Sequence, residues 1–199
     1  MIRTEEADES RSIVVAGLRL EFRRLADRWT HALEIDADPG RRRLLQAVEG
    51  DADRDDPARV VSPTYQELHL QQDGSAVLAL LVGQSGPHHF SAAFTVREEA
   101  GAIVIEADVA DRCRSGIAVL SCTYVVEATS GDLLDADTAQ ASWSLPDLGR
   151  LAFEVVAPGS LALAEGGRRG TQVQAGARIT PDAQTHRCQY LWRWTPASL

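Results

Sequence analysis

The chain lacks lysine and asparagine altogether, and it contains only three cysteines among its 199 residues. Without lysine there is no amine for a Schiff base, no Ser–Lys dyad and no phosphate-binding lysine of the Walker type. Without asparagine there is no acceptor for N-linked glycosylation. These absences exclude several classes of nucleophilic and phosphate-binding site.

The cysteines, Cys113, Cys122 and Cys188, are odd in number and form no CxxC pair. They therefore indicate reduced, buried thiols and neither a disulfide framework nor a zinc finger. The first ten residues are acidic, unlike a secretory signal, and the longest aliphatic run, 77–82, is too short to span a bilayer. We predict a cytoplasmic protein without a membrane segment.

The charge balance is acidic, with 20 basic residues against 29 acidic ones and a net charge of -9. No overall field attracts nucleic acid or anionic lipid, so neither is expected as a partner. A hydrophobic content of 44% is typical of globular domains. We predict a disordered segment over 1–10 and a single β-rich domain over 11–199, with the loop at 51–62 as a place where the domain could be subdivided.

Apolar residues recur with a period near two along most of the chain, which indicates strands. The runs 13–22 and 29–35 predict a hairpin joined around Leu25–Asp27, and a helix over 18–34 is the alternative. The stripe Leu44, Leu45 and Val48, followed by Gly50, predicts one short helix near residues 41–49.

From Thr64 onward, short apolar runs alternate with turns such as Asp73–Gly74. Strands are predicted near 64–71, 76–82, 88–97, 102–109, 117–128, 150–157, 171–179 and 184–194. Helices long enough to connect parallel strands are missing. We therefore predict an all-β, mainly antiparallel sandwich or barrel of about ten strands.

Motifs for chemistry are scarce. Ser85 follows an aliphatic strand, but Pro87 and a second strand stand where a nucleophile elbow needs glycine and a helix. His88 and His89 are adjacent, so on a strand they point to opposite faces and cannot both bind one metal ion. The sequence predicts neither a metal site nor a cofactor.

Aromatic and histidine side chains share strand faces in two places. Trp29 and His31 alternate on one run, and a second face collects more of them: His186, Tyr190, Trp192 and Trp194. Such faces line pockets for apolar or planar ligands, and they equally form the core wall of a sandwich. We take these residues as candidate ligand-binding residues.

A polar face carries Tyr65, Glu67 and His69 at a spacing of two. Titratable groups so placed can serve acid–base chemistry in a cleft, with His88 or His186 as a further member, although a solvated sheet face has the same pattern. The leading hypothesis is a binding module for a small apolar ligand or a protein partner. The alternatives are an enzyme that uses Glu67 and His69, and a structural homodimer.

Overall fold

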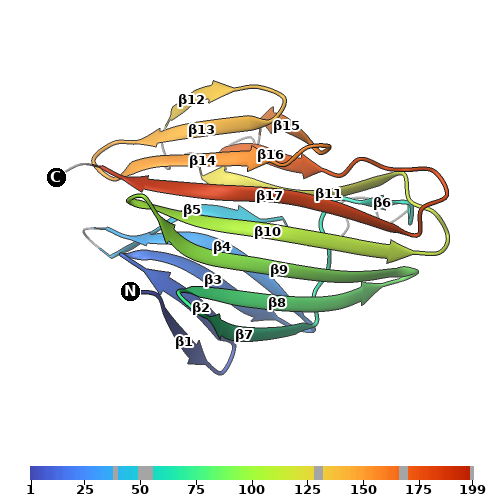
Figure 1. Cartoon of the computed structure of the whole chain (residues 1–199), viewed down its shortest axis with the longest axis horizontal. Helices are drawn as coiled ribbons and strands as arrows, with labels where there is room; N and C mark the ends of the chain where they lie inside the picture. The colour runs from blue at the N-terminus through green and yellow to red at the C-terminus, as the bar shows by residue number, and fades with distance from the viewer. Residues whose placement is uncertain (38–39, 49–55, 128–131, 166–169, 198–199) are drawn as a thin grey trace.

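The computed structural model describes residues 1–37, 40–48, 56–127, 132–165 and 170–197. Within these residues every regular element is a strand, and the strands form two layered sheets (Figure 1). The prediction of an all-β, mainly antiparallel sandwich is therefore confirmed. None of these residues forms a helix long and apolar enough to cross a membrane.

The first sheet has nine strands, of which eight follow one another in the order β1-β2-β3-β4-β5-β11-β16-β15, and β6 pairs with β11. Its pairs are antiparallel except β6 with β11, which is parallel. In that order the bounds are β1 (Arg3–Ala7), β2 (Ser10–Val15), β3 (Leu18–Leu25), β4 (Arg28–Asp36), β5 (Arg41–Ala47), β11 (Val119–Glu127), β16 (Gly170–Gly176), β15 (Ser160–Glu165) and β6 (Arg59–Val60).

The second sheet has eight strands in the order β12-β13-β14-β17-β10-β9-β8-β7 and is antiparallel throughout. The bounds are β12 (Asp132–Ala136), β13 (Gln140–Leu145), β14 (Gly149–Val155), β17 (Thr185–Pro196), β10 (Ala102–Cys113), β9 (His88–Glu99), β8 (Ala76–Ser85) and β7 (Glu67–Asp73).

The core lies between the sheets and is one cluster to which both contribute. In β9 and β17 buried and less buried residues alternate until the last two residues, because successive side chains point to opposite faces of a strand. Aromatic rings fill the centre, with Phe153 and Trp192 4.2 Å apart between ring centroids. Trp192 and Trp194 thus form part of the core wall.

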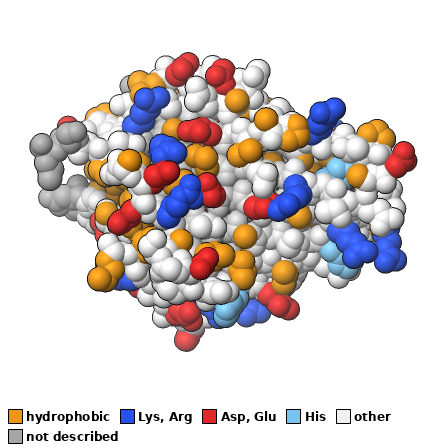
Figure 2. All heavy atoms as spheres, in the orientation of Figure 1, with side chains coloured by type: hydrophobic (Ala, Val, Ile, Leu, Met, Phe, Trp, Pro, Cys, Tyr) orange, Lys and Arg blue, Asp and Glu red, His pale blue; other side chains and the backbone are white. Residues whose placement is uncertain are grey.

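The outer face of the second sheet is covered by interspersed acidic and basic side chains (Figure 2). Arg97 pairs with Glu106 at 2.7 Å, and Arg187 donates to Asp108 across the pair β10–β17. Each of these arginines has an acidic neighbour, so this face forms no unopposed basic patch around them.

The predicted hairpin at the N-terminal end is confirmed: β3 and β4 pair antiparallel around the turn at Ala26–Asp27. The run 13–22, however, is two strands and not one. Ala16 and Gly17 both have positive φ angles, of 45° and 82°, and they make the tight turn between β2 and β3. Such breaks, together with unpredicted strands such as β12 and β13, explain why there are 17 strands among the described residues, not about ten.

The prediction of a helix near 41–49 is wrong, because Arg41–Ala47 is strand β5, paired with β4 and β11. Leu44 and Leu45 are adjacent and both buried, so the segment lacks the alternation of a half-exposed strand and imitates a helical stripe. A register shift in the β4–β5 pair, at Leu33/Glu34, interrupts the pattern further.

The N-terminal residues, predicted to be disordered over 1–10, contain β1, which pairs with β2 from Arg3 to Ala7. Backbone pairing orders this polar segment, although its composition offers little apolar surface to bury. The first part of the predicted 51–62 loop, residues 51–55, lies outside the described residues, and the rest includes β6.

Candidate functional site

A pocket opens between the start of β4, the end of β5, the segment 62–65 and β11. Its volume is about 30 Å³, room for roughly two water molecules, whereas pockets for drug-sized ligands measure roughly 300–1,000 Å³. It can therefore enclose one functional group of a ligand, and not a whole apolar molecule.

The deep wall of the pocket is a chain of hydrogen bonds that joins the two sheets. His31 Nε2 on β4 shares a hydrogen bond of 2.8 Å with the Tyr124 hydroxyl on β11, and that hydroxyl shares another with the Tyr190 hydroxyl on β17. All three side chains are buried. Neighbouring rings hold them in place, with the ring centroids of His31 and Phe94 4.8 Å apart.

Burial keeps this chain uncharged at neutral pH. It lowers the pKa of His31 from 6.5 to about 4, because a buried imidazolium loses its hydration. It raises the pKa of the phenols of Tyr65, Tyr124 and Tyr190 well above the ordinary value. The wall thus offers neutral donors and acceptors and no buried charge.

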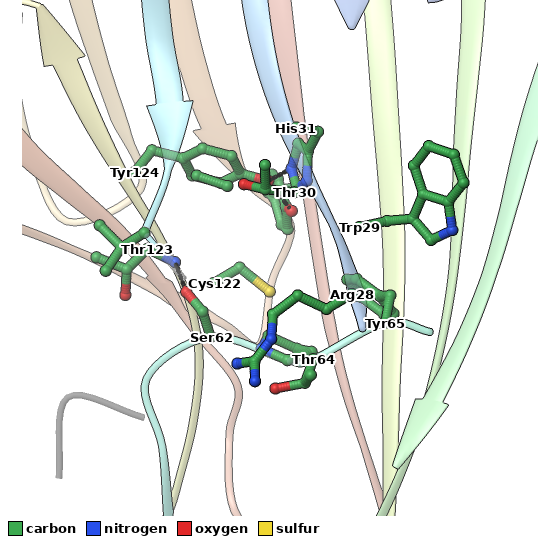
Figure 3. Close-up of a pocket in the computed structure, with 14 residues that line it drawn as sticks. Arg28, Trp29, Thr30, His31, Ser62, Thr64, Tyr65, Cys122, Thr123 and Tyr124 are labelled. Atoms are coloured by element: carbon green, nitrogen blue, oxygen red, sulfur yellow. Dashed lines mark hydrogen bonds between the residues drawn. The ribbon is translucent and has the colours of Figure 1, made fainter. Parts of the chain in front are cut away.

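The mouth of the pocket carries a guanidinium and hydroxyl groups. In Figure 3 the Arg28 side chain extends toward Thr64 and Ser62, which line the same pocket. Arg28 is the only ordinarily charged side chain among the described residues that line the pocket, and its Nε lies 3.1 Å from Asp27. Thr30 Oγ1 is buried and has no hydrogen-bond partner among the described residues.

The segment 62–65 forms one side of the pocket because it approaches β8 very closely. A Cβ atom on Gly83 would lie 2.0 Å from the carbonyl oxygen of Thr64, so only glycine fits there. The chain then changes sheets: the Trp29 amide donates to the Tyr65 carbonyl at 2.7 Å, whereas Glu67 pairs with Val82 in the second sheet.

The predicted ligand-binding residues fall into two groups. Trp29, His31 and Tyr190 line the pocket. The Trp29 indole points away from the polar side chains in Figure 3, and the Arg11 guanidinium lies 5.6 Å from its centroid. Trp192 packs behind the pocket, 5.2 Å from Tyr124 between ring centroids, whereas Trp194 and His186 are buried elsewhere.

The predicted polar face is divided in the structure. Tyr65 is buried and lines the pocket, whereas Glu67 and His69 are exposed on the edge strand β7. His186 lies 3.1 Å from the Thr180 carbonyl. Among the described residues, no hydrogen bond connects Glu67 or His69 with His88 or His186.

His88 is held in a separate buried site. Its Nδ1 lies 2.7 Å from Asp111 Oδ2, and its Nε2 lies 2.6 Å from the carbonyl oxygen of Pro57. Asp111 has no exposed surface. The two contacts of His88 connect β9 with β10 and with the segment before β6. In the described part of the chain no group of three or more His, Cys, Asp or Glu side chains is arranged to hold a metal ion.

Several pocket residues have no signal in the sequence. Arg28, Ser62, Thr64, Cys122 and Tyr124 come from three distant segments. Tyr124 and Cys122 lie in a run that is apolar on both faces, so nothing marks them as different from other core residues. Asp111 breaks the alternation of β10, because it lies on the buried face with Val109 and Cys113, and this break is the one signal of its burial that the sequence carries.

Comparison with known proteins relates this chain to others by fold alone. No family model matches the chain, and no curated protein matches it in sequence. Among solved structures, a heparan sulfate lyase HepC mutant from Pedobacter heparinus has a similar fold, with a TM-score of 0.58 at 10% sequence identity. The similarity covers 100% of this chain and 35% of the lyase chain, so the chain spans about a third of the length of that enzyme.

Proposed function

We propose that the protein is a binding module whose inter-sheet pocket takes the carboxylate group of a small ligand. The observation that carries the proposal is the position of Arg28 at the mouth, as the only charged side chain among the described lining residues. A guanidinium matches a carboxylate with two parallel hydrogen bonds. The ligand body would lie outside, against Pro63, because the pocket encloses only about 30 Å³.

The hydroxyl groups around the pocket support the same ligand class. Ser62 Oγ accepts a hydrogen bond from the Thr123 amide at 3.2 Å, which leaves its own proton available. Thr30 Oγ1 is buried without a partner among the described residues. A bound oxygen group would satisfy such hydroxyls, and leaving one unpaired in a buried site costs about 1–3 kcal/mol.

Charge limits the size of the ligand. The chain has a net charge of -9, so a long polyanion is repelled by the molecule as a whole even though Arg28 attracts one anionic group. The lyase with the similar fold is named for heparan sulfate, a polyanion whose sugars carry carboxylates, and 10% identity supports the fold and not the substrate. A single carboxylated sugar is the probe that these two facts suggest.

The test is a titration of the ¹⁵N-labelled protein with sodium glucuronate, followed by amide chemical shifts, with glucose and sodium chloride as matched probes. We expect glucuronate to shift the amides of residues 28–31, 62, 64, 65 and 122–124, and glucose to shift none. Arg28→Gln should weaken the binding about tenfold, corresponding to roughly 1.4 kcal/mol. Arg24→Gln, which changes an exposed arginine on β3, should leave it unchanged.

Two results would contradict the proposal. Equal shifts with glucose would show that the guanidinium does not select the ligand. Glucuronate shifts confined to the arginines on the outer face of the second sheet, or no shifts at all, would show that the pocket is not a binding site.

A further inference from the structure

Two cysteines face each other across the sandwich next to the pocket. Cys122 lies on β11 in the first sheet and Cys188 lies on β17 in the second, and both are buried in the shared core. Cα atoms of β11 and β17 come within 8 Å of each other, closer than the roughly 10 Å that usually separates packed sheets. The two sheets therefore approach each other closely at these strands.

The register of the strands brings the thiols together. Tyr124 and Tyr190 each lie two residues beyond a cysteine, and their hydroxyls share a hydrogen bond across the core. Since residues two apart on a strand point to the same face, Cys122 and Cys188 project toward each other beside that contact. A hydrogen bond with the Cys188 thiol, together with burial, raises the pKa of Cys122 well above its ordinary value.

We propose that Cys122 and Cys188 form a redox-sensitive pair that closes into a disulfide between the two sheets when hydrogen peroxide enters the pocket. Cys122 lines the pocket, and its sulfur points into it in Figure 3. Hydrogen peroxide has two heavy atoms, which suits a volume of about 30 Å³. The proposal needs no other ligand and does not depend on the proposed function.

The oxidation balances in two steps. The Cys122 thiolate attacks one oxygen of the peroxide, the O–O bond breaks, and the leaving hydroxide takes up the thiol proton as water, which leaves a sulfenic acid. The Cys188 sulfur then attacks Cys122 Sγ, the S–O bond breaks, and a second water leaves. Two thiols and one peroxide yield one disulfide and two waters. Because the thiolate reacts and the pKa of Cys122 is raised, the first step should accelerate as pH rises.

Cys113 provides a matched control. It is also buried, but it lies at the end of β10, where its Sγ donates to the Gly116 carbonyl at 3.5 Å. It does not line the pocket. Oxidation that depends on the pocket and on a facing thiol should therefore leave Cys113 reduced.

The experiment treats the folded protein with hydrogen peroxide and follows its intact mass and its unreduced tryptic peptides. We expect a loss of two hydrogens and a cross-link between peptides 115–150 and 188–193 in the natural protein and in Cys113→Ser. Cys122→Ser and Cys188→Ser should form no cross-link. The disulfide should raise the melting temperature by about 5–15 °C. If a variant fails to fold, the peptide map of the natural protein tests the proposal by itself.

Three outcomes would overturn the proposal. The first is a cross-link that involves Cys113, and the second is a sulfinic or sulfonic acid on Cys122 without a cross-link. The third is no change in the folded protein at a peroxide concentration that fully oxidises the same thiols in guanidinium chloride.

Discussion

Two buried histidines in this protein show how surroundings decide what the same side chain does. His31 lies among aromatic rings, and its partner is a neutral phenol, Tyr124. His88 lies between a carboxylate, Asp111, and a backbone carbonyl. Both are less than a tenth exposed. Burial alone therefore does not set the role of a histidine, because the partners decide whether a charge can be tolerated.

The difference shows in the direction of the hydrogen bonds. Both partners of His88 are acceptors, a carboxylate oxygen and a backbone carbonyl oxygen. His31 has one neutral hydroxyl partner, which can donate to or accept from the ring. The His88 site thus connects three segments through two acceptor oxygens, whereas the His31 chain is a neutral polar wall for the pocket.

The largest predicted effect breaks the contact between His88 and Asp111. Asp111→Ala leaves His88 buried without its carboxylate, and we expect a loss of about 3–5 kcal/mol in the free energy of unfolding. Urea unfolding measures it. Asp108→Ala, on the exposed face of the same strand, is the matched control and should cost less than about 1 kcal/mol. Similar losses in both variants would show that the His88 pair contributes no more than a surface pair.

The next effect is the pH dependence from His31. Its pKa is about 4 in the folded state and about 6.5 in the unfolded state, so the unfolded chain takes up a proton first as pH falls. The contribution of neutral His31 to the free energy of unfolding is fully present above pH 6.5. It is lost as pH falls from 6.5 to 4, by about 3 kcal/mol in total.

Unfolding free energies measured from pH 7.5 to 4 test this prediction. His31→Gln should flatten the decline in that range, whereas His69→Gln, which changes an exposed histidine, should leave it as it is. An unchanged pH dependence in His31→Gln would assign the decline to other groups.

The smallest predicted effect concerns the hydrogen bonds that join His31, Tyr124 and Tyr190. Tyr124→Phe removes the hydroxyl that contacts both His31 and Tyr190, and we expect a loss of about 2 kcal/mol. Tyr190→Phe removes the hydroxyl at the end of the chain and should cost about half as much. Thermal unfolding of the two variants compares them directly, and a larger loss in Tyr190→Phe would refute the central position of Tyr124.

Local sequence patterns predicted the elements that alternate and turn tightly. The pair β3–β4 follows from alternation around Ala26–Asp27, and β7–β8 follows from the turn at Asp73–Gly74. The pattern misled where a strand is buried on both faces: Leu44 and Leu45 imitate a helix because each packs on a side that only the assembled sheet provides.

The candidate site was predictable in part. Trp29, His31 and Tyr190 were marked by their type and spacing, and they do line the pocket. Arg28, Thr64 and Cys122 were not marked, because an arginine, a threonine or a cysteine on a strand has no distinctive local signal. The position of Thr64 also depends on Gly83, which lets the segment 62–65 approach β8.

A period near two, turn residues and the absence of connecting helices leave few options besides antiparallel sheets, so the class of fold follows from local patterns in the chain. The pairing of β5 with β11 and the contact of Tyr124 with Tyr190 across the core exist only in the folded molecule. The two kinds of feature differ in the distance along the chain over which they are set. Alternation and turn conformation depend on neighbouring residues, whereas strand partners and the charge of a buried histidine depend on desolvation and contacts between segments far apart in the chain.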